Sequence, residues 1–262
     1  MTCLRTEVIR EDWVEHVRKD LRTKGYYYEP EFCSETGDAQ PVVTAASLLG
    51  HLYVPPDTNP SQPVILTQPS PLAPQWRPFD QCGAIGWHND FSTRTNRPVL
   101  SLSWVRNEDP GGPSGGAWRV ASVAAILDKL CQTWEGKRLA AELAARAEPF
   151  GYRDAGGWRP FRIITKRDST MRRCGLRFYG RALEEGGWLR FGQVPDRTRE
   201  IIARVEEAAD AVGEVLQAST GALLIADNRY SLHDRIEQQV TGPEGHRRQA
   251  WLCFVKRLHQ PL

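Results

Sequence analysis

The sequence predicts a mainly β fold with flanking α-helices, in which antiparallel strands pair into two sheets. Segments rich in β-branched and aromatic residues fall in two separated blocks, at about 85–105 and 158–193. Segments of helical period lie before and between these blocks, which places helices outside the sheets. Strands and helices do not alternate one by one as in a βαβ repeat, so a parallel sheet is not expected.

The composition bounds the class of protein. With 262 residues, 40% of them hydrophobic, one domain spanning 1–262 is expected. A formal net charge of +2 gives no reason to expect nucleic acid as a partner. The first thirty residues carry charges throughout, and no apolar run of about eighteen residues occurs, so we expect no membrane partner and a cytoplasmic location. The oligomeric state is left open.

The first third of the chain is predicted to open on a helix. Ile9, Trp13, Val17 and Leu21 are spaced four apart and form one apolar face, which ends near Gly25. The segment "GYYYEPEF" then reads as a strand. Residues 34–80 hold many prolines and little periodicity, so we expect a loop-rich segment with a short helix near "TAASLLGHLYV", and a candidate lid.

In the middle of the chain, "AIGWHND" and "RPVLSLSWV" are predicted strands, followed by turn chemistry in "DPGGPSGGAW". Residues 120–147 are helical in period and composition. In the second β block we expect strands in "WRPFRIITK", "MRRCGLRFYGRAL" and "GWLRFG". Glycine pairs near Trp118, Trp158 and Trp188 favour three hairpin turns.

The last third begins with the strongest helical pattern, over 195–217, with Pro195 near its first turn. A strand "TGALLIADN", a polar turn "RYSLHDR" and a closing strand "QAWLCFVKRL" complete the prediction.

A histidine and an aspartate are separated by one residue in "WHNDFST". In an extended strand His88 and Asp90 project to one side and Asn89 to the other. Of the remaining histidines, His233 is the best partner, because it follows one buried-looking strand and precedes another. Two histidines and one carboxylate, with open positions opposite, describe a non-heme Fe(II) oxygenase site. Taken alone, the His-x-Asp pair is more often structural.

The open positions of such a site accept a bidentate co-substrate and dioxygen. A co-substrate that has a distal carboxylate needs a bidentate arginine partner, which lysine replaces poorly. Arg247 and Arg248 stand at the start of the closing strand. A one-residue change of register exchanges the faces on which they lie, so the residues alone leave the choice open.

Three segments in order, "WHNDFS", "LLIADNRYSLHDR" and "RRQAWLCFVKR", resemble the Fe(II)/2-oxoglutarate-dependent dioxygenases of the taurine dioxygenase and clavaminate synthase-like group. The resemblance spans essentially the whole chain. It implies a distorted double-stranded β-helix, or jelly roll, with outer helices, and it implies Fe(II), 2-oxoglutarate and dioxygen. The residues that match the catalytic iron ligands are His88, Asp90 and His233. Arg248 is the preferred anchor for 2-oxoglutarate, with Arg247 as the alternative.

The chain departs from this group at one position. A threonine that often contacts 2-oxoglutarate after the glycine pair is replaced near Trp118, and Ser101, Ser103 or Ser122 are the candidate substitutes. Asn228 and Arg229 match the "DNR" turn, in which Asn228 is expected to fix the turn by side-chain hydrogen bonding.

The resemblance implies an oxygenase that acts on a C–H bond of a small molecule, an amino acid or an amino-acid-derived metabolite within biosynthesis. Hydroxylation is expected first, and desaturation or cyclisation are open. Related halogenases replace the carboxylate ligand with a small residue, so Asp90 argues against halogenation. The candidate substrate contacts are Trp87, Arg94, Trp118 and Arg235. The alternatives are an oxygen-independent metal-dependent jelly-roll isomerase or epimerase and a non-catalytic jelly-roll binding module.

Overall fold

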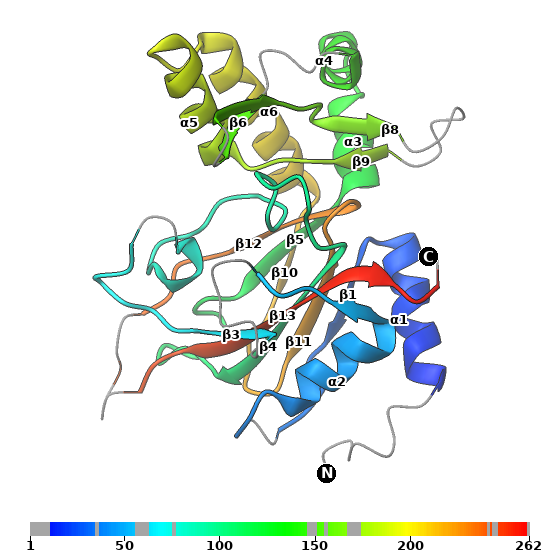
Figure 1. Cartoon of the computed structure of the whole chain (residues 1–262), viewed down its shortest axis with the longest axis vertical. Helices are drawn as coiled ribbons and strands as arrows, with labels where there is room; N and C mark the ends of the chain where they lie inside the picture. The colour runs from blue at the N-terminus through cyan, green and yellow to red at the C-terminus, as the bar shows by residue number, and fades with distance from the viewer. Residues whose placement is uncertain are drawn as a thin grey trace.

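The structure is a computed structural model (Figure 1). It describes residues 11–34, 37–55, 63–74, 77–145, 151–154, 157–166, 174–239, 242 and 246–260. Residue 9 of the predicted first helix lies outside these ranges.

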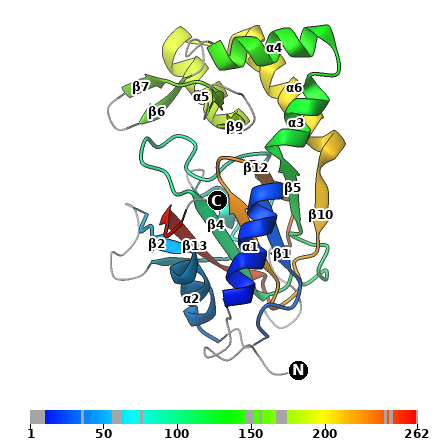
Figure 2. The ribbon, with the colours of Figure 1, turned by 90° about the vertical axis from the view of Figure 1, so that its right-hand side faces the viewer.

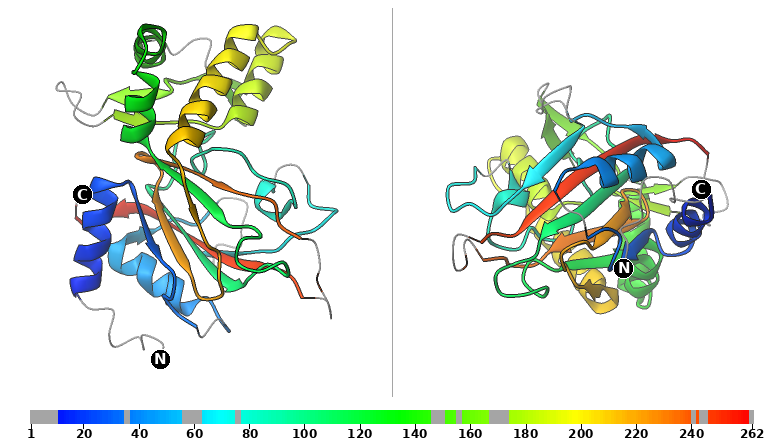
Figure 3. Two further views of the ribbon diagram at one scale, coloured as in Figure 1. Left: turned by 180° about the vertical axis from the view of Figure 1, so that it is seen from behind. Right: turned by 90° about the horizontal axis from the view of Figure 1, so that it is seen from below.

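The larger sheet has six antiparallel strands. Its order is β1 (Tyr26–Glu29), β11 (Leu223–Asp227), β4 (Leu100–Asn107), β13 (Gln249–Leu258) and β2 (Gly50–Leu52), and β3 (Val64–Thr67) also pairs with β13. Helices α1 (Glu11–Thr23) and α2 (Gln40–Leu49) cover its outer face, as Figures 1 and 3 show. Every residue of β11 is buried, because this central strand is covered on both faces.

The smaller sheet contains β10 (Glu214–Leu216), β5 (Trp118–Ser122) and β12 (Ser231–Arg235), all antiparallel. It faces the inner side of the larger sheet (Figure 3). Tyr26, Val105 and Leu224 from the larger sheet pack with Trp118 and Val120 from β5 in one buried cluster. The predicted pair of antiparallel sheets with flanking helices is therefore confirmed.

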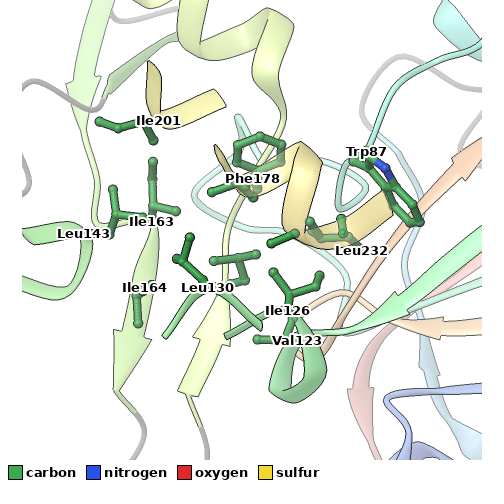
Figure 4. Packing of buried hydrophobic residues seen from close by; sticks show 14 of the residues in the cluster. Trp87, Val123, Ile126, Leu130, Leu143, Ile163, Ile164, Phe178, Ile201 and Leu232 are labelled. Carbon is green, nitrogen blue, oxygen red and sulfur yellow. The ribbon is translucent and has the colours of Figure 1, made fainter. Parts of the chain in front are cut away.

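A layer of helices and two short hairpins packs against one end of the sheets (Figures 1 and 2). Its elements are α3 (Val123–Leu130), α4 (Trp134–Ala145), α5 (Gly180–Phe191), α6 (Asp196–Val212), the β6 (Gly151–Asp154) and β7 (Gly157–Pro160) hairpin, and the β8 (Ile164–Lys166) and β9 (Cys174–Leu176) hairpin. Figure 4 shows the core of this layer, in which Ile126, Leu130, Ile163 and Phe178 are buried together.

Several predicted elements hold. Helix α1 and its end before Gly25, which has φ +84°, agree with the expectation, as do β1 and β13. The helix predicted over 195–217 forms α6 only as far as Val212, because Gly213 is extended and the next three residues form β10. Residues 34–80 contain more regular structure than predicted, since α2, β2, β3 and the short 3-10 helix η1 (Pro78–Asp80) all lie there. The predicted helix near "TAASLLGHLYV" begins earlier, at Gln40, and gives way at Gly50 to a strand paired with β13.

The segment "AIGWHND" is not a regular strand. Only isolated bridges join His88 to Tyr179 and to His233. Left-handed conformations at Gly86 (φ +88°) and Phe91 (φ +53°) end the extended stretch on both sides, so no ladder can propagate.

Other boundaries were predicted wrongly. Residues 120–122, predicted as the start of a helix, belong to β5, and Ser231–Arg235, predicted as a turn, form β12. Trp188 lies within α5 rather than in a hairpin, because buried Gly186 and Gly187 let this helix approach the segment before α6, where a Cβ on Gly187 would lie 3.0 Å from Pro195 Cδ. The glycine pair before Trp118 does form a turn that leads into β5, and β7, which contains Trp158, forms a hairpin with β6.

No helix within the described ranges combines the length and the apolar character that crossing a membrane requires.

Shortening one side chain in the helical layer tests the packing seen in Figure 4. Ile126 is fully buried, so Ile126→Val is expected to lower the free energy of unfolding by about 1 kcal/mol. The exposed Leu72 gives the control, since Leu72→Ala should change it by less than about 0.5 kcal/mol. Urea unfolding followed by tryptophan fluorescence measures both. Equal effects of the two variants would contradict the packing described.

Candidate metal centre

A cavity of about 680 Å³ lies between the two sheets and is closed on one side by the first turns of α5. Ser101 and Ser103 of β4 and Leu252 and Phe254 of β13 line the side formed by the larger sheet. The facing wall comes from the smaller sheet and carries His233 and Arg235 of β12 and Trp118 of β5.

Three potential metal ligands meet in this cavity: His88, Asp90 and His233, whose ligand atoms all lie within 4.8 Å of one another. His233 Nε2 is 3.1 Å from Asp90 Oδ2, and His88 Nε2 is 3.7 Å from Asp90 Oδ1. They form the one cluster of three or more such residues among the positions that the structure describes.

The backbone positions these side chains although no regular strand contains His88. Backbone hydrogen bonds run both ways between His88 and His233, at 2.9 and 3.0 Å, which sets the two imidazoles side by side. Asn89 points away, as predicted: its Nδ2 donates to the Ser231 carbonyl and its Oδ1 accepts from the Phe178 amide. Local extension at this point is therefore enough to place His88 and Asp90 on one side.

Asn228 supports the carboxylate ligand. Its Oδ1 accepts a hydrogen bond from the Asp90 amide at 3.0 Å, and its Nδ2 donates to Ser101 Oγ at 2.7 Å. The side chain of Asn228 was predicted to fix its own turn, but its hydrogen bonds go to other segments, and within the turn it is Asp227 Oδ1 that accepts from the Arg229 amide.

The electrostatics favour a cation in the triad. Burial opposes ionisation of Asp90, yet the imidazoles of His233 and His88 outweigh it and hold the pKa of Asp90 well below its usual value. Burial also opposes a charged His88, but hydrogen bonding and attraction to Asp90 raise its pKa. An ionised carboxylate between two imidazoles offers the donor set that a divalent cation would bind.

Arg248 is buried in the cavity wall, with 3% of its surface exposed. Its Nε and Nη2 are buried and have no hydrogen-bond partner among the described residues. Burial, with a contribution from the nearby Arg235, lowers the pKa of Arg248 to about 9. An anion would stabilise a guanidinium in this state, because an unpaired buried donor is costly.

Gly116 makes room for the Arg248 side chain. It has φ +62°, and a Cβ there would lie 2.5 Å from Arg248 Cδ. The adjacent Arg247 is exposed and does not line the cavity. Just before β13, Arg248 is therefore turned into the cavity and Arg247 toward solvent.

Arg235 serves the structure of the cavity rim. It donates to the carbonyls of Ile236, Gln81 and Gly83 at 2.7 to 2.9 Å, so it holds the 81–83 loop against β12. It also lines the cavity.

The remaining candidates divide between cavity and core. Arg94 and Trp118 line the cavity, whereas Trp87 packs in the core of the helical layer (Figure 4) and donates to Asp210 Oδ1 at 2.8 Å. Trp87 is therefore not supported as a substrate contact, because its indole packs in the core and does not line the cavity. Of the three serines, Ser101 and Ser103 line this cavity and Ser122 lines another.

Sequence reasoning missed the contribution of α5. Tyr179, Arg181 and Glu185 line the cavity, and Tyr179 bridges to His88. The sequence predicts a strand over 171–183, of which Cys174–Leu176 forms β9 and Gly180 begins α5, and no local signal there points to a distant metal ligand.

No family model matches the chain, and no curated protein matches it. Among solved structures, asparagine oxygenase in complex with Fe(II), 2S,3S-3-hydroxyasparagine and succinate superposes with a TM-score of 0.73 at 17% identity, over 95% of this chain and 81% of that one. The non-heme iron oxygenase OrfP in complex with Fe and alpha-ketoglutaric acid gives 0.64 at 12%, over 95% and 81%. A taurine dioxygenase from Burkholderia xenovorans gives 0.63 at 16%, over 97% and 84%. The chain therefore has the fold of these oxygenases.

Proposed function

We propose that this chain is an Fe(II)/2-oxoglutarate-dependent oxygenase that acts on a C–H bond of a small molecule. One observation carries the proposal: a His-Asp-His cluster and a buried arginine, two of whose nitrogens have no partner among the described residues, line the same cavity. Either feature alone has a structural explanation. Together they supply what a metal and a bidentate anionic co-substrate need.

The donor set fits Fe(II), because two imidazoles and one carboxylate leave open positions on the metal. His88, Asp90 and His233 would hold it. Bound Fe(II), together with 2-oxoglutarate and dioxygen, supplies the oxidising power for C–H chemistry. Asp90 occupies a position that would otherwise be open to a halide, so hydroxylation is proposed ahead of desaturation or cyclisation, and halogenation is not.

Arg248 would bind the distal carboxylate of 2-oxoglutarate through its two unpartnered nitrogens. The hydroxyls of Ser101 and Ser103 line the same cavity and can replace the threonine contact that Trp118 displaces. Leu224, Leu252 and Phe254 surround this region with apolar surface, which limits access of water to the reacting centre.

The substrate side of the cavity is proposed to take an amino acid or an amino-acid-derived metabolite. Arg94 and the neighbouring Arg181 and Glu185 line it and offer charges of both signs. Asparagine oxygenase and OrfP, which share the fold, have been crystallised with 3-hydroxyasparagine and (3S)-hydroxy-L-Arg. We keep Arg235 as a rim residue with access to the substrate.

We further propose that the two sheets are those of a distorted double-stranded β-helix and that 1–262 forms one domain. The cavity draws lining residues from both sheets and from α5, so neither part contains the site alone. A lid within 34–80 stays a prediction, with Arg77, Pro78 and Phe79 as its lining residues.

The proposal is tested first without oxygen. Anaerobic addition of Fe(II) and 2-oxoglutarate should give a visible charge-transfer band that is absent with Fe(II) alone. Admission of oxygen with a panel of amino acids should then yield succinate and a product heavier by one oxygen atom, measured by mass spectrometry. Turnover without oxygen and 2-oxoglutarate would favour an isomerase or epimerase. Absence of both the band and metal affinity would favour a binding module.

A further inference from the structure

Asp234, the neighbour of His233 on β12, is fully buried and ionically paired. Its Oδ2 accepts from Arg119 Nε at 3.0 Å and Nη2 at 2.6 Å. Its Oδ1 accepts from the Gly86 amide at 2.8 Å. A buried carboxylate is costly unless its oxygens are satisfied, and here one of the two is used entirely on the segment that leads to His88.

Gly86 links that carboxylate to the metal centre. While its amide is held by Asp234, its carbonyl oxygen lies 2.8 Å from His88 Nδ1. The left-handed conformation of Gly86, φ +88°, is what lets both groups be used at once. When His88 Nδ1 donates to this carbonyl it carries the ring proton, which leaves the lone pair of Nε2, on the side of Asp90, available to a metal.

The second histidine lacks such support. His233 Nδ1 is buried without a hydrogen-bond partner among the described residues. The orientation of His233 therefore comes from β12 itself, whereas that of His88, which belongs to no regular strand, depends on Gly86.

We infer that Asp234 is a positioning residue of the metal centre: it holds the Gly86 peptide so that His88 is kept in the tautomer that presents Nε2 to a metal. The inference rests on the proposed metal-binding role of His88. It explains why an ionised carboxylate is kept buried beside the site, since the hydrogen bonds that orient a ligand commonly influence its affinity for metal.

The same network contains a natural control. Arg119 also donates to Asp210 Oδ1 at 2.7 Å, and Trp87 Nε1 donates to that oxygen. The Asp210 side chain is 54% exposed, and its oxygen contacts Arg119 and Trp87. Asp210→Asn thus disturbs Arg119 on the side away from His88, while Asp234→Ala removes the acceptor of the Gly86 amide.

The experiment measures Fe(II) affinity by anaerobic titration. Asp234→Ala should weaken it by roughly 10- to 100-fold, and Asp210→Asn by no more than about threefold, as for an exposed ion pair. Asp234→Asn, whose amide oxygen can still accept from Gly86, should recover most of the loss. If Asp234→Ala does not fold, Gly86→Ala replaces it: no atom lies within 4 Å of the added Cβ, so only the backbone conformation is strained, and a loss of the same size is expected.

A second readout needs no metal. Nitrogen-15 imidazole spectra of the metal-free wild type at alkaline pH should show His88 protonated on Nδ1, and Asp234→Ala should give a mixture of tautomers. Equal affinities in Asp234→Ala and Asp210→Asn, or an unchanged His88 tautomer, would overturn the inference. A wild-type protein that binds no Fe(II) would instead contradict the proposed function.

Discussion

His233→Ala is expected to eliminate Fe(II) binding at micromolar metal and, with it, succinate formation. Removal of an outer hydrogen-bond partner of a metal ligand typically costs roughly 10- to 100-fold in affinity, and loss of the ligand itself should exceed that range. The imidazole is also the partner that lies 3.1 Å from Asp90 Oδ2, so the remaining pair, His88 and Asp90, provides only two ligand atoms. Anaerobic titration and the 2-oxoglutarate-dependent charge-transfer band both report the loss.

The matched control is His246→Ala. His246 is exposed, its Nε2 contacts the Glu108 carbonyl, and it does not line the cavity. Its replacement should leave the band and the turnover unchanged within about twofold, as for a surface substitution. If His233→Ala retained the charge-transfer band while His246→Ala lost it, the metal would lie elsewhere and the proposal would be wrong.

The ligand set illustrates what sequence can supply. The i, i+2 spacing of His88 and Asp90 needs only a locally extended backbone, and the chain provides this with two isolated bridges instead of a strand. His233 was predicted from its place between two strands. The strand boundaries differ from the prediction, but backbone hydrogen bonds to His88 bring the two imidazoles together, as the prediction required. Short-range geometry and the order of motifs were enough for these three.

The parts that could not be predicted depend on long-range burial. The segment "SLHDR" is polar and its sequence predicts a turn, yet it forms strand β12. Its buried charges are paired there: Asp234 accepts from Arg119, and Arg235 donates to carbonyls of the 81–83 loop. Those partners are 115 and roughly 150 residues away along the chain. Likewise Gly186 and Gly187 signal a turn locally but allow close helix packing in the fold. Local propensity cannot anticipate a partner that only the tertiary structure brings near.

The choice between the two adjacent arginines yields the second large effect. Arg248→Met should raise the KM for 2-oxoglutarate by about 100-fold, because loss of charge-assisted hydrogen bonds to a carboxylate costs about 3 kcal/mol. Arg248→Lys should recover part of this, since it restores the charge without the planar fork. Arg247→Met, which changes an exposed side chain one residue away, should leave the KM within about twofold. The reverse ranking of the two methionine variants would assign the co-substrate to Arg247.

The stability of the Arg248→Met variant gives an independent check on the same residue. Replacing an arginine that supports the fold lowers stability, whereas replacing Arg248 is not expected to lower it. The pKa of Arg248 lies near 9, below its ordinary value, because burial disfavours the charged form, so at neutral pH the charge costs folding free energy until an anion pairs with it. Arg248→Met should therefore have a Tm equal to or above that of the wild type when 2-oxoglutarate is absent. 2-Oxoglutarate, added with a redox-inert divalent metal, should raise the wild-type Tm. At a 2-oxoglutarate concentration of 100 times its Kd, binding adds about 2.7 kcal/mol to the free energy of unfolding. The Tm of Arg248→Met should rise far less. A variant that is destabilised without ligand, and stabilised by it as much as the wild type, would show that Arg248 supports the fold and does not bind the co-substrate.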